Sequence, residues 1–399
     1  MKILMLTPYL PYPLHSGGQT RSFNLIKNLG KKHQITLFSF IREDKERQYQ
    51  KHLSPFCQQI KLFKRRRAWA PINLLLAGFS PYPLLVSIYF SRYFRKVIAK
   101  KLNTQNYDLI HVENFYLMQN IPQTKVPILL VDQTIEYRVY QHFVDTFPKS
   151  LFFLKPLLRL DVAKIKFWET FYWQKANLMV AVSQEDKKLI QSLVKDLKVK
   201  IVPNGVDENY FKKRIYSRAK EPLILFGIAN FKWMQNKEGA RLLINFVWPL
   251  IKKQIPQAKL WIVGRHAPEF LRMFRMEDVF VKETQKPRKV YQQAWVLVAP
   301  MKSGGGSRTK FFEAMASGLP IVTTSEGIEG IEATAGKDIL VSDNLKELAQ
   351  KTITLIQKRD LADKISEKAQ KLAKKKYGWD KSAQKLEKAY QEVARGKKA

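Results

Sequence analysis

Residues 295–316 read WVLVAPMKSGGGSRTKFFEAMA, an apolar run followed by a glycine-rich loop and a segment with helical spacing. Consecutive glycines at the start of a helix expose backbone N–H groups that can bind phosphate oxygens. Arg308 and Lys310 fall in the first turn of this helix, where a cation opposes the helix dipole unless an anion binds nearby. The stretch predicts a strand–loop–helix unit with a site for a phosphorylated ligand. The alternative is a loop whose cations are simply hydrated.

The same alternation of short apolar runs and helical segments continues along the whole chain, which is typical of parallel sheets joined by helices. The expected strands are 3–6, 35–40, 59–63, 109–112, 128–131, 178–182 and 200–202, and then 223–226, 260–263, 279–281, 295–299, 321–323 and 339–341. The expected helices include 20–29, 84–102, 156–175, 236–253, 307–316, 345–358, 361–376 and 380–393. Two doubly wound domains follow from this pattern, with a hinge in the polar run 208–221.

Composition narrows the class of protein. The 399 residues include 70 Lys and Arg against 34 Asp and Glu, which gives a net charge of +36. This charge indicates a polyanionic partner, or else a surface that is rich in lysine without any specific partner. A single cysteine excludes an internal disulfide and a thiolate zinc site, and the histidines show no metal-ligand spacing, so we expect no metal. No signal peptide is recognisable at the start, which favours the cytoplasm.

Several stretches, in this order and spacing, resemble retaining glycosyltransferases of family four (glycosyl transferases group 1), in their glycine-rich-loop subgroup. They are TPYLPYPLHSGGQTRSFNLIKNL (7–29), VAVSQEDKKLI (180–190), IVPNGVDENYF (201–211), FGIANFKWMQNKEGARLL (226–243), PQAKLWIVG (256–264), APMKSGGGSRTKFFEAMASGLPIVTTSEGIEG (299–330) and KKYGWD (375–380). The resemblance covers nearly the whole chain.

This resemblance implies the α/β fold called GT-B, in which two Rossmann-like domains with doubly wound parallel sheets face a cleft. The expected domains are an acceptor-binding domain over 1–213, a nucleotide-sugar-binding domain over 214–378 and a helix over 379–399 that crosses back to the first domain. The implied reaction moves a hexosyl group, with retention and without a metal or other cofactor, from a nucleotide diphosphate sugar to a glycan or lipid-linked acceptor. The product would serve surface polysaccharide or glycolipid biosynthesis.

The resemblance also implies donor-binding residues. The backbone of the glycine-rich loop and the cations after it would stabilise the diphosphate leaving group, and Glu313 would bind the ribose. Lys232, Arg308 and Lys310 are the candidates to substitute for a family arginine whose position here is near Ile228, and a glutamate of the family is replaced by Gly305. The expected donor-binding residues are Gly17, Gly18, Lys232, Gly304, Gly305, Gly306, Ser307, Arg308, Lys310 and Glu313.

Polar residues at the ends of two expected strands are candidates for acceptor binding. His111 and Glu113 close the strand 109–112, and Glu136 follows the strand 128–131. Many relatives carry a catalytic histidine where Glu113 stands. We therefore expect Glu113, Glu136, Arg308 and Lys310 to be catalytic, while Asp132 could simply cap the next helix.

A membrane contact is another expectation. The basic run 61–67 precedes Trp69, the helix 84–102 combines basic and aromatic residues, and 151–173 is rich in Phe, Trp and Lys. The alternative is helices packed on the first domain with a hydrated basic face. The uncharged stretch 68–91 contains three prolines, so we expect two packed or interfacial segments and no transmembrane helix.

Two other functions stay open from the sequence. The charge suggests a basic nucleic-acid-binding protein, although no helix-turn-helix, zinc or RNP signature is present, which makes nucleic acid an unlikely partner. The substitution at Gly305 suggests a GT-B protein that has lost catalysis and only binds nucleotide or glycan.

Overall fold

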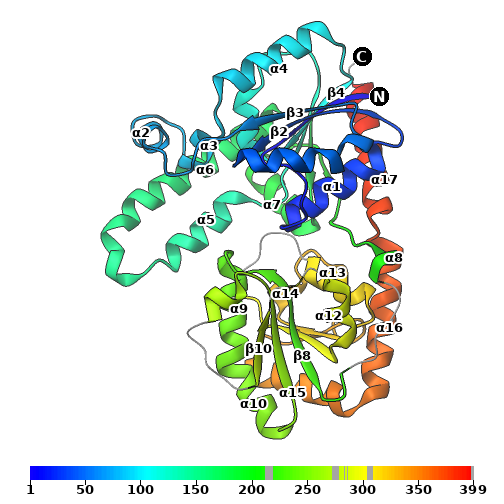
Figure 1. Cartoon of the computed structure of the whole chain (residues 1–399). Coiled ribbons are helices and arrows are strands. Elements are labelled where there is room, and N and C mark those ends of the chain that lie inside the picture. Colours follow the sequence, from blue (N-terminus) through cyan, green and yellow to red (C-terminus); the bar gives the residue numbers. More distant parts are fainter. Residues whose placement is uncertain (212–218, 272–277, 283, 285, 303–308, 397–399) are drawn as a thin grey trace. The chain divides into compact units, whose positions relative to one another are not determined.

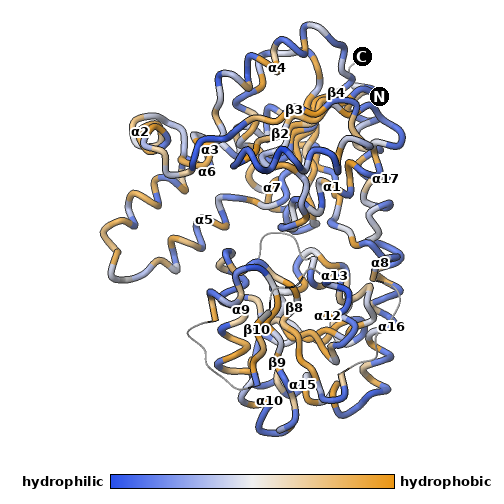
Figure 2. The backbone as a smooth tube through the Cα atoms, in the orientation of Figure 1, coloured by the Kyte–Doolittle hydropathy of each residue, from blue (hydrophilic) through white to orange (hydrophobic). Residues whose placement is uncertain are grey.

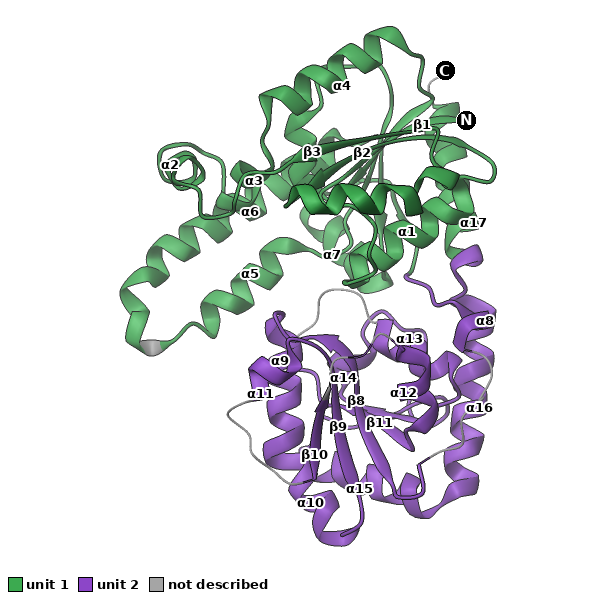
Figure 3. Ribbon diagram, viewed as in Figure 1, with its two compact units in different colours: residues 1–203, 305–307, 382–399 green, residues 204–304, 308–381 purple. Residues whose placement is uncertain are grey.

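The computed structural model describes residues 1–211, 219–271, 278–282, 284, 286–302 and 309–396. These residues form two compact units (Figure 1, Figure 3). Unit 1 comprises Met1–Pro203 and the C-terminal segment from Ser382, and unit 2 comprises the described residues between Asn204 and Lys381. Part of the expected hinge, residues 212–218, lies outside the described residues.

Unit 1 is built on a seven-stranded parallel sheet with the strand order β3-β2-β1-β4-β5-β6-β7. The strands are β1 Lys2–Thr7, β2 Gln34–Ile41, β3 Gln59–Lys64, β4 Leu109–Glu113, β5 Ile128–Val131, β6 Leu178–Ala181 and β7 Val199–Ile201. The central strands are largely apolar on both faces because both faces are covered, and Figure 2 shows the strands of this sheet as mostly hydrophobic. The strand order reverses between β1 and β4, where such sheets leave a crevice at the carboxyl ends.

Helices connect these strands. They are α1 Gly17–Leu29, η1 Asp44–His52, η2 Ser54–Phe56, α2 Pro71–Phe79, α3 Leu84–Tyr89, α4 Arg92–Thr104, η3 Phe115–Asn120, α5 Glu136–Asp145, η4 Lys149–Leu154, α6 Lys155–Lys175 and α7 Gln184–Leu193, with the η segments being 3₁₀ turns. Helix α6 is the longest of them and lies beside α5 (Figure 1).

The single helix expected over 84–102 is wrong. The chain leaves the helical conformation at Phe90 and Ser91, and α4 starts afresh with the Ser91 hydroxyl accepting a hydrogen bond from the Phe94 N–H (3.2 Å). Phe94 and Ile98 are completely buried, so this side of α4 packs in the core of unit 1, whereas Tyr93 is 62% exposed. Within the described residues, no helix is long and apolar enough to cross a bilayer.

Unit 2 repeats the architecture with a six-stranded parallel sheet in the order β10-β9-β8-β11-β12-β13. Its strands are β8 Leu223–Asn230, β9 Lys259–Arg265, β10 Val279–Lys282, β11 Val296–Ala299, β12 Ile321–Thr323 and β13 Leu340–Val341. Its helices are α8 Glu208–Phe211, α9 Met234–Leu242, α10 Trp248–Gln254, α11 Ala267–Leu271, α12 Pro287–Gln293, α13 Thr309–Ala316, α14 Ser325–Ile328, α15 Leu345–Gln357 and α16 Arg359–Lys376, with a π turn, Leu243–Val247, between α9 and α10. The strand order reverses between β8 and β11.

The fold class is therefore confirmed as two doubly wound, Rossmann-like parallel-sheet domains. The last helix, α17 (Trp379–Arg395), belongs from Ser382 onward to unit 1. Leu386 and Tyr390 on this helix are buried in the same apolar cluster as Ile3 and Leu25. Lys32 forms an ion pair with Glu387 (3.0 Å) at the edge of this contact. The core of unit 1 is thus completed by residues from the far end of the sequence.

We expect Leu386→Ala to lower the free energy of unfolding of unit 1 by about 2–5 kcal/mol, because the completely buried leucine leaves a cavity. Urea unfolding measures the change, and hydrogen exchange resolved by region assigns it to unit 1. Lys388→Ala on the exposed side of the same helix is the matched control and should change little. Equal stabilities for both variants would contradict the role assigned to α17.

Candidate functional site

A buried polar cluster lies at the carboxyl ends of β1, β4 and β5 in unit 1. Glu113 at the end of β4 is completely buried; one carboxylate oxygen accepts from His111 Nε2 (3.1 Å) and the other from Gln133 Nε2 (2.6 Å). Because a carboxylate can only accept, His111 carries a proton on Nε2, and its Nδ1 forms a second hydrogen bond with the Tyr390 hydroxyl of α17. Both ring nitrogens of His111 therefore have protein partners.

Opposing effects set the pKa of Glu113. Burial acts to raise the pKa, but the hydrogen bond and charge of His111, the charge of Arg21 and the hydrogen bond from Gln133 lower it more, and it ends below its ordinary value. Arg21 is itself completely buried, in α1. Glu113 is thus a fully ionised carboxylate held by neighbouring donors and a neighbouring cation.

The glycine pair opens α1 at this cluster. The helix begins at Gly17, and the Ser16 hydroxyl caps it by accepting from the Gln19 N–H (3.3 Å). A Cβ atom on Gly18 would lie 2.2 Å from the Tyr9 hydroxyl oxygen and 2.8 Å from Gln133 Oε1. Gly18 therefore packs closely against the polar cluster, and a larger residue there would displace the ends of the Tyr9 and Gln133 side chains.

The carboxyl groups of Asp132, Glu136 and Glu169 lie close to one another beyond the carboxyl end of β5. Asp132 does not cap the following helix; it accepts from the Phe115 N–H (2.9 Å) at the start of η3 and from the indole N–H of Trp173. The cap of α5 comes from Glu169 on α6, whose carboxyl oxygens accept from the N–H groups of Glu136 (2.8 Å) and Tyr137 (3.1 Å). A residue remote in sequence thus fixes the start of α5.

Burial raises the pKa of each of these carboxyl groups. It raises the pKa of Asp132 to about 7 and that of Glu136, with a further contribution from the charge of Asp132, to about 8, while the pKa of Glu169 lies well above its ordinary value. At neutral pH Glu136 is mostly protonated. It is partly exposed at the start of α5, where a protonated carboxyl can donate a hydrogen bond to a ligand.

Lys310 is held in a fixed position in unit 2. Its side chain is buried in the first turn of α13, its Nζ donates to Asn236 Oδ1 (3.1 Å), and it lies 3.9 Å from the centroid of the Phe226 ring. Gly227, with a positive φ of 95°, makes room: a Cβ there would lie 3.1 Å from Lys310 Cδ. The strand β8 and helix α13 together fix this ammonium group at the carboxyl edge of the sheet.

Glu313 lies one turn further along α13. Tyr291 on α12 accepts a hydrogen bond from the Ile228 N–H (3.3 Å) and shares one with the Glu313 carboxyl group. Burial raises the pKa of Glu313 to about 7, although the Tyr291 hydrogen bond opposes the shift. Ile228, where the resemblance expects an arginine, contributes its backbone to this arrangement.

The structure thus gathers the sequence candidates into separate groups. Gly18, His111 and Glu113 join the polar cluster of unit 1, with Gly17 starting the adjoining helix, and Glu136 lies at the carboxyl cluster. Lys310 and Glu313 share α13, whereas Lys232 is exposed and its backbone N–H donates to Asn230 Oδ1 (3.0 Å). Gly304, Gly305, Gly306, Ser307 and Arg308 lie outside the described residues. Over the part of the chain that is described, no three His, Cys, Asp or Glu side chains are grouped as a metal would need.

Sequence reasoning missed Asn236, Tyr291, Glu169 and Tyr390. The available signal for Asn236 was its place in the stretch 226–243, as a polar residue where a loop leads into a helix. Tyr291, Glu169 and Tyr390 lie on helices, and the sequence around each gives no sign of its hydrogen-bond partner, because these contacts arise from tertiary packing.

Two family models match the chain: "Glycosyl transferases group 1" over residues 222–358 and "Glycosyltransferase Family 4" over residues 15–210. A curated relative is an uncharacterized 44.6 kDa protein in the cps region of Klebsiella pneumoniae, 20% identical over 366 residues that cover 86% of this chain and 88% of the relative.

Solved structures share the fold at low identity. Sucrose-phosphate synthase from Thermosynechococcus elongatus matches with a TM-score of 0.72, 16% identity and coverage of 99% of this chain and 100% of that chain. S. aureus TarM, in a complex containing UDP, matches with a TM-score of 0.69, 12% identity and coverage of 98% and 99%. Anabaena HepE in complex with UDP and glucose matches with a TM-score of 0.65, 14% identity and coverage of 98% and 100%.

We expect Glu136→Gln to remove part of the loss of stability at high pH. A carboxyl group whose pKa is raised in the folded state stabilises that state below its unfolded pKa, and this contribution is lost as the pH rises through about 8. The variant should therefore gain more than about 1 kcal/mol over the parent at about pH 9 and nothing at about pH 4. Chemical denaturation at both pH values measures the difference.

The exposed Glu185 in the first turn of α7 provides the control, since Glu185→Gln removes an acidic group that is not buried. If the two Gln variants had the same pH profile, burial would not control the protonation of Glu136.

Proposed function

The chain belongs to the glycosyltransferases of group 1 and family 4, with the GT-B fold, and we propose that it transfers a hexosyl group with retention from a nucleotide diphosphate sugar to a glycan or lipid-linked acceptor. The cps-region relative supports a place in surface polysaccharide or glycolipid biosynthesis. The observation that carries the proposal is the buried ammonium group of Lys310 at the start of α13.

Lys310 fits the role of a leaving-group stabiliser. A cation in the first turn of a helix opposes the helix dipole, and here Asn236 and Phe226 hold the ammonium group in place at the carboxyl edge of the sheet, where a diphosphate would bind it. In the transfer, the bond between the anomeric carbon and the diphosphate oxygen breaks and negative charge develops on that oxygen. A fixed, water-shielded cation stabilises this charge most strongly in the transition state.

Glu313 would bind the ribose hydroxyl groups of the donor. Its pKa near 7 means that both protonation states are accessible at neutral pH, and hydroxyl donors would favour the carboxylate. Tyr291 orients this carboxyl group and also accepts a hydrogen bond from the Ile228 N–H. Tyr291 is thus a positioning residue for the donor site.

In unit 1 we assign acceptor binding to Glu136, whose partly exposed carboxyl group is able to donate a hydrogen bond at neutral pH. Glu113 and His111 have their polar atoms engaged inside the cluster, and this supports a positioning role next to Gly18. The acceptor hydroxyl attacks the anomeric carbon on the face that the diphosphate leaves, and its proton passes to the departing phosphate oxygen, so no metal ion is required.

UDP is the first donor nucleotide to test. The TarM, HepE and pneumococcal O-GlcNAc transferase structures contain UDP or UDP-glucose, and these proteins share the fold of this chain. A panel of UDP-, GDP-, ADP-, CMP- and dTDP-sugars, with DNA and RNA oligomers alongside, distinguishes the functions. A ligand at about 100 times its dissociation constant stabilises by about 2.7 kcal/mol, a visible shift of the unfolding midpoint.

Stabilisation by one nucleotide sugar followed by formation of a glycosylated product supports the proposal. Stabilisation without turnover on any acceptor indicates a protein that only binds nucleotide or glycan. A shift with nucleic acid alone, falling steeply with salt, indicates a basic nucleic-acid-binding protein.

We expect Lys310→Ala to lower the turnover number by about 100- to 1000-fold, because the charge on the departing diphosphate loses its fixed counter-charge. Lys302→Ala is the matched control, since Lys302 is exposed and lies on the same loop before α13. Steady-state kinetics with the donor identified by the panel measures both. Near-normal turnover in Lys310→Ala would refute the role given to this residue.

A further inference from the structure

Helix α2 has the reverse of the usual distribution of polar and apolar residues. Asn73 is its one buried residue, and its amide donates to the carbonyls of Arg67 (2.8 Å) and Ala68 (3.2 Å). Leu75 and Phe79 are 54% and 89% exposed. A helix of a globular protein turns its apolar side chains inward, so this outward apolar surface calls for an apolar partner.

Helix α6 and the turn before it expose apolar side chains as well. Leu157 and Phe167 are 63% and 60% exposed, and Leu160 lies between them on the same side of the helix. Phe152 and Phe153 in η4 are also largely exposed. Hydrophobic residues alternate with polar ones along α6 (Figure 2).

Hydrogen bonds hold α2 and α6 next to each other. Lys164, between Leu160 and Phe167 on α6, donates from Nζ to the carbonyls of Ala77 (2.8 Å) and Ser80 (2.9 Å) at the end of α2. The Trp168 indole donates to the Pro81 carbonyl (2.8 Å) just beyond. We call the exposed side chains of α2, of the loop before it and of α6 the apolar surface: Trp69, Leu75, Phe79, Leu157, Leu160 and Phe167.

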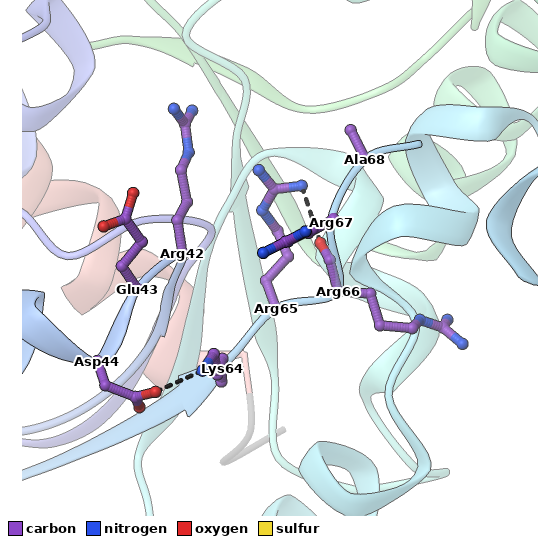
Figure 4. A pocket seen from close by; sticks show the side chains of 8 residues that line it. All are labelled: Arg42, Glu43, Asp44, Lys64, Arg65, Arg66, Arg67 and Ala68. Carbon is purple, nitrogen blue, oxygen red and sulfur yellow. Dashed lines mark hydrogen bonds and ion pairs between the residues drawn. The ribbon is translucent and has the colours of Figure 1, made fainter. Parts of the chain in front are cut away.

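A basic pocket precedes α2 in the sequence and adjoins it in space. It has a volume of about 390 Å³ and is lined by Arg42, Glu43, Asp44, Lys64, Arg65, Arg66, Arg67 and Ala68 (Figure 4). Asn73 ties the two together, since its amide binds the carbonyl of Arg67.

The acidic groups of the pocket are already neutralised. Glu43 pairs with Lys45 (2.6 Å), and Asp44 pairs with Lys64 and with Arg47 (3.2 Å). Arg66 turns away from the other arginines and donates to the carbonyls of Ser87 (3.0 Å) and Phe90 (2.9 Å) (Figure 4). Arg42, Arg65 and Arg67 therefore give the pocket an excess of positive charge.

We propose that unit 1 docks on an anionic lipid bilayer, with the apolar surface in the boundary between headgroups and acyl chains and with Arg42, Arg65 and Arg67 on lipid phosphates. An apolar helix flanked by arginines and a tryptophan is suited to this depth of a bilayer. The docking surface is separate from the donor-binding residues of unit 2. Its existence does not depend on the proposed reaction.

Charge decides against a second copy of the chain as the occupant. Two copies meeting through this surface would bring their arginine-rich pockets close together, and each chain carries a net charge of +36. Like charges at such an interface oppose association. An anionic lipid surface presents the complementary charge.

The test is flotation of the full chain with phosphatidylcholine vesicles, with or without phosphatidylglycerol. We expect binding to the anionic vesicles that weakens with salt. Leu75→Ser/Phe79→Ser should lower the partition coefficient at least about tenfold, because exposed apolar area no longer enters the bilayer. Arg65→Gln/Arg67→Gln should lower it about fivefold for each charge removed.

Matched controls come from unit 2. Phe246→Ser removes a phenylalanine that is 57% exposed outside the apolar surface, and Lys374→Gln/Lys375→Gln removes two exposed charges on α16. Both should bind like the parent. Brominated acyl chains should quench tryptophan fluorescence of the parent more than that of Trp69→Phe, which locates Trp69 in the bilayer. Unchanged thermal midpoints verify that all variants are folded.

Several results would overturn the proposal. One is absence of flotation with anionic vesicles, and another is equal flotation of the parent and Leu75→Ser/Phe79→Ser. Light scattering that shows a dimer lost in Leu75→Ser/Phe79→Ser would assign the surface to a second copy. Stabilisation by inorganic phosphate without vesicle binding would assign the pocket to a free anion.

Discussion

The parallel direction of the strands is the constraint on which both units depend. Because each described strand pair is parallel, the carboxyl ends of the strands meet at one edge of each sheet, and every connection must return through a helix or a long loop. The reversal of strand order at β1/β4 and at β8/β11 then opens that edge. The polar cluster of unit 1 and the group around Lys310 in unit 2 both occupy such positions.

Burial gives these groups their chemical properties. Glu113 stays ionised inside unit 1 only because a histidine, an amide and an arginine compensate for lost hydration. For Asp132 the hydrogen bonds from Trp173 and Phe115 lower the pKa less than burial raises it, and for Glu136 the charge of Asp132 adds to the effect of burial. These two carboxyl groups are therefore mostly protonated or near their midpoint at neutral pH. Glu113 at the end of β4 and Asp132 just after the neighbouring strand β5 thus differ in charge because their neighbours differ.

The sequence predicted the fold class, the order of the strands along the chain and the position of Lys310 at the start of a helix, because apolar periodicity and glycine loops are local signals. It failed at 84–102, where helical spacing continues across Phe90 but the backbone does not. The cap of α5 by Glu169 was equally invisible, since it joins residues that meet only when α6 packs on the sheet. Which side of α2 faces outward also depends on packing, because periodicity locates an apolar stripe without saying what covers it.

Helix α17 has a consequence for how the protein is made. The core of unit 1 includes Leu386 and Tyr390, and His111 in the middle of that unit hydrogen-bonds Tyr390. Ribosomes add about 5–20 residues per second, so the early strands emerge many seconds before their last packing partner. Unit 2 is contained within the stretch between residues 204 and 381 and has all of its residues sooner. The domain that starts first in the sequence is therefore the last to complete its core during synthesis.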